Sequence, residues 1–227
     1  MDTPWWRARH EAVLNRVRQG HVDLLWIGDS ITQDWEHPGP PEWDAFVPVW
    51  NQFYGDRNAV NLGFKGDNTS HLLWRLQHGE VDGISPKAAV LLIGANDMGL
   101  VHWNAEQCTA GIVACVDELG RRLPDTKILL LGVLPSLRSD YVTRTTIRIN
   151  RNLSDLYNAG ARRAVTYMDV SAIFERGGQV DRAQFLDPFL LPPDPPLHPT
   201  AQAQARIAEA IEPTLAHMLG VPSKTRR

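Results

Sequence analysis

The chain has 227 residues, of which 43% are hydrophobic and 22% are charged, and its formal net charge is -3. This composition is typical of one globular domain with a substantial core, and the acidic balance argues against a nucleic-acid partner. No apolar stretch approaches membrane-spanning length, and residues 1–18 lack the apolar region of a signal peptide, so we expect a cytoplasmic protein.

We expect a single domain over residues 1–227, because no linker long enough to divide the chain is visible. A helical pattern indicates that residues 1–20 supply an N-terminal helix that packs on this domain, and residues 220–227 are expected to fray. Cys108 and Cys115 lie seven positions apart in a predicted helix. That spacing is a rise of roughly 10 Å, too long for a disulfide, so both are expected as reduced core residues.

The first predicted strand, residues 22–27, ends in Gly28-Asp29-Ser30. Its apolar run is too short for a helix and is typical of a buried parallel strand. A helix can begin at Ser30, so this serine is expected at the carboxyl end of a strand, where open α/β sheets build their sites. From this stretch alone, Ser30 is either a nucleophile or a simple helix N-cap.

Residues 36–57 form a predicted proline-rich loop with one short helix, and this loop carries several aromatic residues. The aromatic residues either line a substrate pocket or cover the edge of the core. A second strand at residues 59–62 ends in a segment that contains Gly63 and Gly66, where the backbone can approach a ligand closely. His71 and His78 follow on a predicted helix without a third ligand nearby, so no metal site is expected.

The remainder alternates predicted strands with predicted helices. Strands are expected at residues 88–93, 128–134 and 165–170, and helices at residues 106–123, 145–161 and 201–219. This alternation predicts an α/β fold whose five-stranded, mostly parallel sheet is covered on both faces. Asn96 follows the third strand, and His198 precedes the last helix after an irregular proline-rich segment.

These polar positions suggest acyl-transfer chemistry. A serine hydroxyl is a weak nucleophile that needs a base within hydrogen-bonding reach, and His198 is our candidate base for Ser30. Asp194, four residues before it, is our candidate to orient the imidazole. The backbone N–H groups of Ser30 and Gly66 and the side-chain amide of Asn96 are candidate donors to a developing oxyanion.

Four motifs in this order resemble those of the SGNH (GDSL) hydrolase superfamily. They are Gly28-Asp29-Ser30, the glycine segment ending in Gly66, Gly94-Ala95-Asn96-Asp97, and His198. Within the superfamily, the chain is most similar to the α subunits of intracellular platelet-activating-factor acetylhydrolase and their bacterial relatives. The similarity is greatest from His71-Leu72-Leu73-Trp74-Arg75-Leu76 through Gly79-Glu80 to Pro86-Lys87. The resemblance implies a flavodoxin-like three-layer α/β/α fold and a serine esterase that uses no metal or other cofactor.

The same resemblance assigns Ser30 as nucleophile, His198 as base, and Gly66 and Asn96 as oxyanion donors. The family usually places its acid three residues before the histidine, where this chain has Pro195. We therefore expect Asp194 to be the acid, with Asp187 as the reserve candidate and a backbone carbonyl as the third.

The resemblance also implies a small-molecule ester substrate with a short acyl group, acetyl first, on an alcohol that is a sugar or a lipid. A lysophospholipase or longer-chain carboxylesterase is the second enzyme hypothesis, and a binding protein that retains the fold is a non-catalytic one. A homo-oligomer is a reasonable expectation from the family. Asp29 and Asp97 are expected to brace their turns, and Asp67 and Asn68 either contact substrate or cap a helix.

Overall fold

A computed structural model describes residues 3–40, 43–158 and 164–225 of the chain. Its centre is a five-stranded parallel sheet with strand order β2-β1-β3-β4-β5. This order is that of the flavodoxin-like doubly wound sheets, so the expected fold class is confirmed. The strands are β1 (Leu24–Gly28), β2 (Ala59–Gly63), β3 (Ala88–Leu92), β4 (Lys127–Leu131) and β5 (Val165–Met168).

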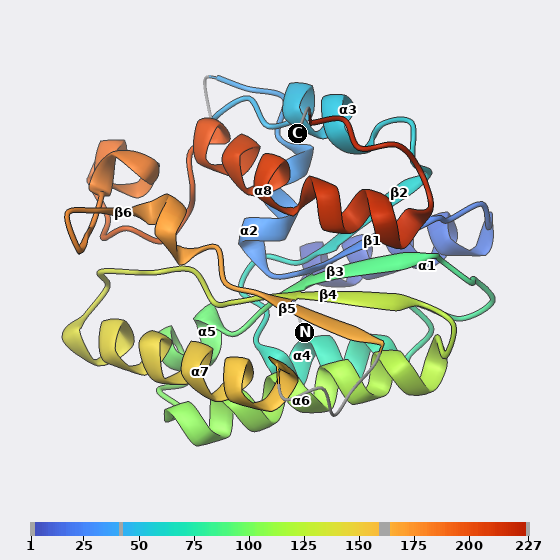
Figure 1. Cartoon of the computed structure of the whole chain (residues 1–227), viewed down its shortest axis with the longest axis horizontal. Helices are drawn as coiled ribbons and strands as arrows, with labels where there is room; N and C mark the ends of the chain where they lie inside the picture. The colour runs from blue at the N-terminus through green and yellow to red at the C-terminus, as the bar shows by residue number, and fades with distance from the viewer. Residues whose placement is uncertain (1–2, 41–42, 159–163, 226–227) are drawn as a thin grey trace.

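Helices cover both faces of the sheet and give three layers (Figure 1). One face carries α1 (Pro4–Arg18), α4 (Thr69–Gln77), α6 (Ala105–Arg122) and α7 (Asp140–Asn158). The other carries α2 (Ser30–Gln33), α3 (Val47–Tyr54) and α8 (Ala201–Leu219). Neighbouring strand residues face opposite layers: Leu25 and Ile27 lie in one core, and Leu24 and Trp26 in the other. A strand buried on both sides offers few polar positions, which is why β1, β3 and β4 are visible in the sequence as continuous apolar runs.

The structure adds several short elements that the periodicity did not predict. A helix of five residues, α5 (Ala95–Gly99), directly follows β3, and α7 begins at Asp140 instead of Thr145. Between β5 and α8 lie the two-stranded pair β6 (Glu175–Arg176) and β7 (Gln179–Val180) and three 3-10 turns: η2 (Ser171–Phe174), η3 (Arg182–Gln184) and η4 (Asp187–Phe189). Strands of two residues and helical segments of three to five residues are too short to produce a hydrophobic period. The predicted end of α7, residues 159–161, lies outside the described residues.

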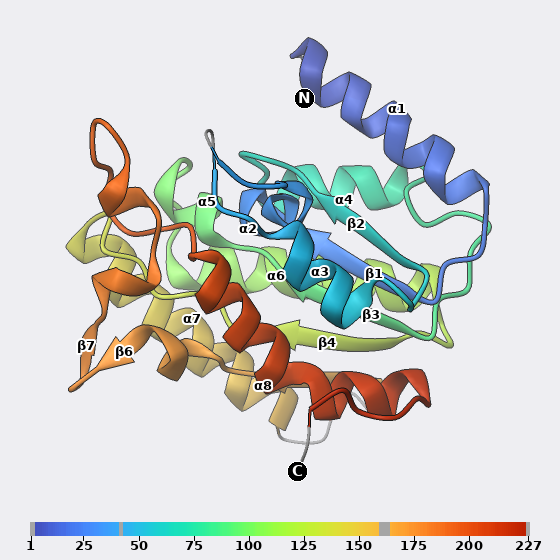
Figure 2. The same cartoon turned by 90° about the horizontal axis from the view of Figure 1, so that it is seen from above.

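The N-terminal helix α1 runs along the β2 side of the molecule, beside α4 (Figure 2). Trp6, Val13 and Val17 of α1 are buried in the same core as α4 and α6. Near the other terminus, the backbone N–H of Lys224 donates to Glu212 of α8 at 2.7 Å, and its ammonium lies 2.5 Å from Asp56. Residues 226 and 227 of the expected frayed tail lie outside the described residues. No helix in the described part of the chain is both long and apolar enough to cross a membrane.

Candidate active site

Ser30 lies at the junction of β1 and α2, where the chain turns sharply from strand to helix. A Cβ on Gly28 would lie 2.2 Å from the carbonyl oxygen of Leu92 and 2.3 Å from the hydroxyl of Thr32, so no other residue fits there. Asp29 caps the new helix by accepting the Ile31 N–H at 3.0 Å, as expected. The turn presents Ser30 at the first helical position, where backbone N–H groups have no intrahelical partner.

His198 meets the serine from the opposite end of the chain. The hydroxyl of Ser30 lies 3.0 Å from His198 Nε2, and His198 Nδ1 lies 2.6 Å from Asp187 Oδ1. The other carboxylate oxygen of Asp187 accepts the backbone N–H groups of Leu197 and His198 at 2.8 and 2.6 Å. Asp187 therefore holds both the imidazole ring and the backbone that carries it.

The expectation that Asp194 orients the imidazole is wrong, because the carboxylate that lies against His198 Nδ1 is that of Asp187. Asp194 is exposed, and its backbone N–H donates to the carbonyl oxygen of Asp187 at 2.9 Å. After Asp187 the chain makes the turn η4, runs out through an exposed segment and returns to His198. The loop brings residues eleven positions apart together and leaves the residue nearer in sequence on its outer side.

The other two motif residues lie at the same edge of the sheet. Gly66 follows β2 with φ of +79°, a conformation that favours glycine, and a Cβ there would meet nothing within 4 Å. Asn96 follows β3, is 5% exposed and donates from Nδ2 to the carbonyl oxygen of Asp67 at 2.8 Å. One amide hydrogen of Asn96 is thus engaged, which fixes the amide and leaves its second hydrogen for another acceptor.

Buried charges control the protonation of the imidazole. Burial by itself would lower the pKa of His198, but the hydrogen bond to Asp187 and the negative charges of Asp34, Asp187 and Asp29 outweigh it, so the pKa lies above its ordinary value. Burial likewise works to raise the pKa of Asp187, yet its bonds with His198 and two backbone N–H groups bring it below its ordinary value. The pair therefore favours a charged carboxylate that stabilises an imidazolium.

Asp29 and Asp97, the two aspartates of the motifs, have raised pKa values, in contrast to Asp187. Burial raises the pKa of Asp29 to about 7 and that of Asp97 to about 6. Asp97 accepts the Thr69 N–H at 3.1 Å and the Thr69 hydroxyl at 2.5 Å, so it braces the start of α4. Both aspartates hold backbone near the site, as expected, and neither contacts His198 by a hydrogen bond among those the structure describes.

A pocket of about 290 Å³ opens onto Ser30 and His198. Its other walls are Gln33, Asp34, His37, Trp43 and Lys65. The ring of Trp43 meets that of His198 edge to face, with centroids 5.6 Å apart. Sequence reasoning missed four of these pocket residues, and their nearness to the two motifs was the only signal available. They are Gln33, Asp34, His37 and Lys65.

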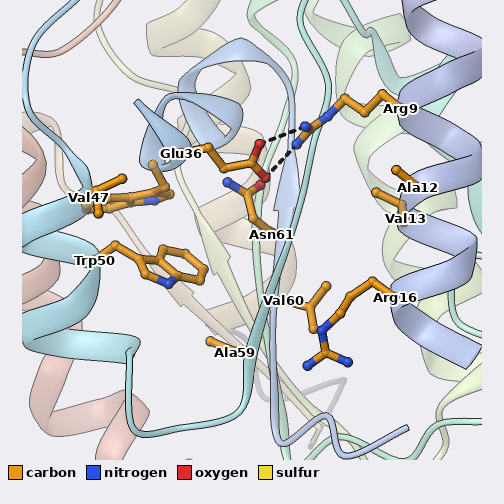
Figure 3. Close-up of a pocket in the computed structure, with 11 residues that line it drawn as sticks. Arg9, Ala12, Val13, Arg16, Glu36, Val47, Trp50, Ala59, Val60 and Asn61 are labelled. Carbon is orange, nitrogen blue, oxygen red and sulfur yellow. Dashed lines mark hydrogen bonds and ion pairs between the residues drawn. The ribbon is translucent and has the colours of Figure 1, made fainter. Parts of the chain in front are cut away.

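The aromatic side chains within positions 36–57 divide between the two expected roles, lining a pocket and covering the core. Trp43 lines the site pocket, whereas Phe46, Phe53 and Tyr54 are buried in the core. Trp50 lines a different cavity of about 570 Å³ between α1 and α3 (Figure 3). Proximity in sequence to Ser30 therefore does not decide which aromatic residue reaches the pocket.

Of the remaining candidates, Asn68 caps α4 by accepting the His71 N–H at 3.0 Å. His71 completes that capping box, and His78 stacks on Trp74 with ring centroids 3.9 Å apart. These contacts agree with a packing role for the two histidines. Cys108 and Cys115 are free and buried, as expected.

The sequence matches the model of the GDSL-like lipase/acylhydrolase family over residues 26–206. It is 34% identical over 131 residues to the platelet-activating factor acetylhydrolase IB subunit alpha2 of Homo sapiens. That match covers 57% of this chain and 52% of the relative, so the chain spans about half the length of the curated relatives it matches.

Two solved structures illustrate the similarity of fold. One, from Streptococcus pneumonia, was solved as a candidate platelet activating factor; it is 23% identical with a TM-score of 0.68, over 93% of this chain and 94% of that one. The other is a catalytic mutant of an acetylxylan esterase from Geobacillus stearothermophilus. It is 18% identical with a TM-score of 0.58, and the match covers 91% of this chain and 98% of that one.

Proposed function

Because this chain belongs to the GDSL-like lipase/acylhydrolase family, we propose that it is a serine esterase that hydrolyses short-chain acyl esters, acetyl esters first. The observation that carries the proposal is the continuous hydrogen-bonded series from Ser30 Oγ through His198 to Asp187, with distances of 3.0 and 2.6 Å. A serine so connected can lose its proton to the imidazole as it attacks a carbonyl carbon.

In the first half of the reaction, Ser30 Oγ bonds to the ester carbonyl carbon while His198 Nε2 takes the hydroxyl proton. Asp187 keeps Nδ1 protonated and stabilises the imidazolium. The carbonyl oxygen becomes an oxyanion that accepts hydrogen bonds from the Ser30 and Gly66 N–H groups and the Asn96 amide. When the tetrahedral intermediate collapses, the ester C–O bond breaks and His198 returns the proton to the departing alcohol.

In the second half, His198 removes a proton from water as the water oxygen attacks the acyl-enzyme. The same donors hold the second oxyanion. Its collapse breaks the bond between the acyl carbon and Ser30 Oγ, His198 returns its proton to Ser30 Oγ, and the carboxylic acid leaves. Atoms balance as one ester and one water giving one acid and one alcohol.

Two observations support a short acyl group. The pocket beside Ser30 is about 290 Å³ and its lining includes the polar side chains of Asp34 and Lys65, which a long alkyl chain would desolvate at a cost. One relative is named an acetylhydrolase subunit and one structural neighbour an acetylxylan esterase. The alcohol portion is accordingly proposed to be a sugar or a lipid.

One feature favours the second candidate, an esterase for lipid substrates with longer chains. Phe189 is 70% exposed and Leu191 is 97% exposed, and both lie on the loop between Asp187 and His198. Exposed apolar side chains on the segment that joins the proposed acid to the proposed base can contact a lipid surface. This candidate therefore enters the same experiment as an alternative outcome.

The test is hydrolysis of p-nitrophenyl esters from acetyl to palmitoyl by the wild type and by Ser30→Ala. We expect kcat/KM to be highest for acetyl or butyryl and to fall at least a thousandfold in Ser30→Ala, because the nucleophile is removed. A maximum at long chains would replace the short-acyl proposal with the lipid candidate. Activity that persists in Ser30→Ala would contradict the role of Ser30 as nucleophile. Activity that is absent at every chain length would contradict the esterase proposal and favour a binding protein.

A further inference from the structure

Asp67 lies between two of the proposed oxyanion donors. It directly follows Gly66, and its carbonyl oxygen accepts the Asn96 amide at 2.8 Å. The residue is only 1% exposed. A displacement of Asp67 would therefore move the Gly66 N–H through the chain and the Asn96 amide through a hydrogen bond.

The carboxylate of Asp67 is held by a buried arginine. Arg75 Nε donates to Asp67 Oδ2 at 2.7 Å, and Arg75 Nη2 donates to the carbonyl oxygen of Gly28 at 3.2 Å. Arg75 Nη1 bonds to Glu80, and the guanidinium lies over the ring of Phe64, 4.0 Å from its centroid. A single fully buried guanidinium thus connects the loop after β2 to the end of β1, two residues before Ser30.

The N-terminal helix holds the same loop from its other side. Trp6 Nε1 donates to Asp67 Oδ1 at 2.8 Å, and Arg9 Nε donates to the carbonyl oxygen of Gly63 at 2.7 Å. The other two guanidinium nitrogens of Arg9 bond to both oxygens of Glu36 at 2.8 and 2.9 Å, as the dashed lines in Figure 3 show. Glu36 ends the 3-10 turn η1 (Asp34–Glu36), which directly follows α2, the helix that begins at Ser30. Helix α1 therefore contacts both the loop after β2, which contains Gly66, and the segment that begins at Ser30.

We infer that Asp67, fixed by Arg75 and by Trp6 of α1, is the positioning residue of the oxyanion hole. The inference rests on the proposed esterase function and deepens it. Donors stabilise an oxyanion only when they are held at the position where its charge develops, and misplacement by about 1 Å can cost about 10² in rate. Two charge-assisted contacts on a buried carboxylate supply that rigidity.

Trp6→Phe tests this inference with little disturbance, because it keeps an aromatic ring in the cluster and removes the N–H that bonds to Asp67. The matched control is Trp74→Phe, since Trp74 packs on Trp6 with ring centroids 5.7 Å apart. No hydrogen bond from the Trp74 indole to the loop of Gly66 appears among the described residues. Asp67→Asn is the stronger variant, because it removes the charge that pairs with Arg75.

For each variant we would measure kcat and KM with p-nitrophenyl acetate, and the melting temperature. A third measurement is the inhibition constant of phenylboronic acid, which forms a tetrahedral adduct with an active serine. We expect kcat to fall about fivefold in Trp6→Phe and about 10² in Asp67→Asn, with KM within twofold, because one oxyanion hole serves both halves of the reaction. The inhibition constant should rise by the same factors. Trp74→Phe should change neither quantity.

A purely structural role for Asp67 predicts a lower melting temperature with unchanged kcat and boronate inhibition, and that result in Trp6→Phe would overturn the inference. If Asp67→Asn does not fold, the comparison of Trp6→Phe with Trp74→Phe still decides. Wild-type protein without Ser30-dependent hydrolysis would instead refute the proposed function itself. The two failures are therefore distinguishable.

Discussion

At the scale of single residues, the proposed catalytic centre depends on how Asp187 uses both carboxylate oxygens. One oxygen meets the imidazole, and the other accepts two backbone N–H groups of Leu197 and His198. An aspartate that only approached the ring would leave the histidine backbone free to move. Asp187 instead fixes the position and the tautomer of His198 together.

This arrangement predicts different results for two conservative variants. Asp187→Asn should lower kcat by about 10³ to 10⁴, because an amide at that position favours the wrong imidazole tautomer. Asp194→Asn is the matched control and should keep kcat within about twofold, since its exposed side chain lies outside the hydrogen-bonded series. Steady-state kinetics with p-nitrophenyl acetate measure both, and an equal loss in the two variants would contradict the assignment.

The charges around His198 predict the pH dependence of kcat/KM. The imidazole must be neutral to accept the proton of Ser30, so activity is lost as the pH falls through the pKa of His198. Because this pKa is raised, the midpoint of the acidic limb should lie above the ordinary value of about 6.5.

Asp34→Asn removes one of the negative charges that raise the pKa of His198 and should shift this midpoint to lower pH. Profiles of kcat/KM from pH 5 to 9 measure the shift, with Asp194→Asn as the unshifted control. A midpoint at or below 6.5 in the wild type would contradict the electrostatic argument.

At the scale of elements, helix ends and turns carry the reacting groups. Ser30 begins α2, Asn96 lies in the first turn of α5, and His198 lies just before α8, whose N-cap Thr200 accepts the Ala203 N–H at 3.1 Å. The helices that hold these groups must themselves be fixed to the sheet and to each other. A buried ion pair does this between α3 and α8.

Arg57, just after α3, donates to both carboxylate oxygens of Glu212 in α8 at 2.8 and 2.6 Å, and both side chains are almost fully buried. Arg57→Met or Glu212→Leu alone should lower the free energy of unfolding by about 3–5 kcal/mol, because each leaves an unpaired buried charge. The double variant should lose less free energy of unfolding than either single variant, because it leaves no unpaired charge.

Denaturation by guanidinium chloride measures these differences. Arg121→Ala, at the exposed pair with Glu118, is the control and should leave the unfolding midpoint nearly unchanged. Single and double variants with equal losses would show that the ion pair has no such role.

At the scale of the whole molecule, strand order determines where the site forms. In the order β2-β1-β3-β4-β5 the connection from β1 runs to β2 on one side and the connection from β3 runs to β4 on the other, so a crevice opens beyond the carboxyl ends of β1 and β3. Ser30 follows β1, Asn96 follows β3 and Gly66 follows the neighbouring β2. The proposed nucleophile and oxyanion donors therefore converge without any of them being close in sequence.

The amino-acid sequence by itself determined the fold class and most of these positions. Strands buried on both faces must be apolar throughout, so β1, β3 and β4 were visible as short apolar runs. The polar residues that end them, Ser30 and Asn96, were conspicuous because parallel strands bring such ends to one edge. Local rules were sufficient wherever a residue's role depends on its own strand or turn.

Only the tertiary structure decided which groups meet across the edge of the sheet. Asp187 replaces Asp194 because the loop after η4 doubles back, and the path of a proline-rich loop is not encoded by spacing. Asp34 became a wall of the pocket. Arg75, which appears in the sequence as one charged residue on a helix, proved to be a buried connection between the loop after β2 and the end of β1. Contacts between distant segments depend on how the layers pack, and no local period carries that information.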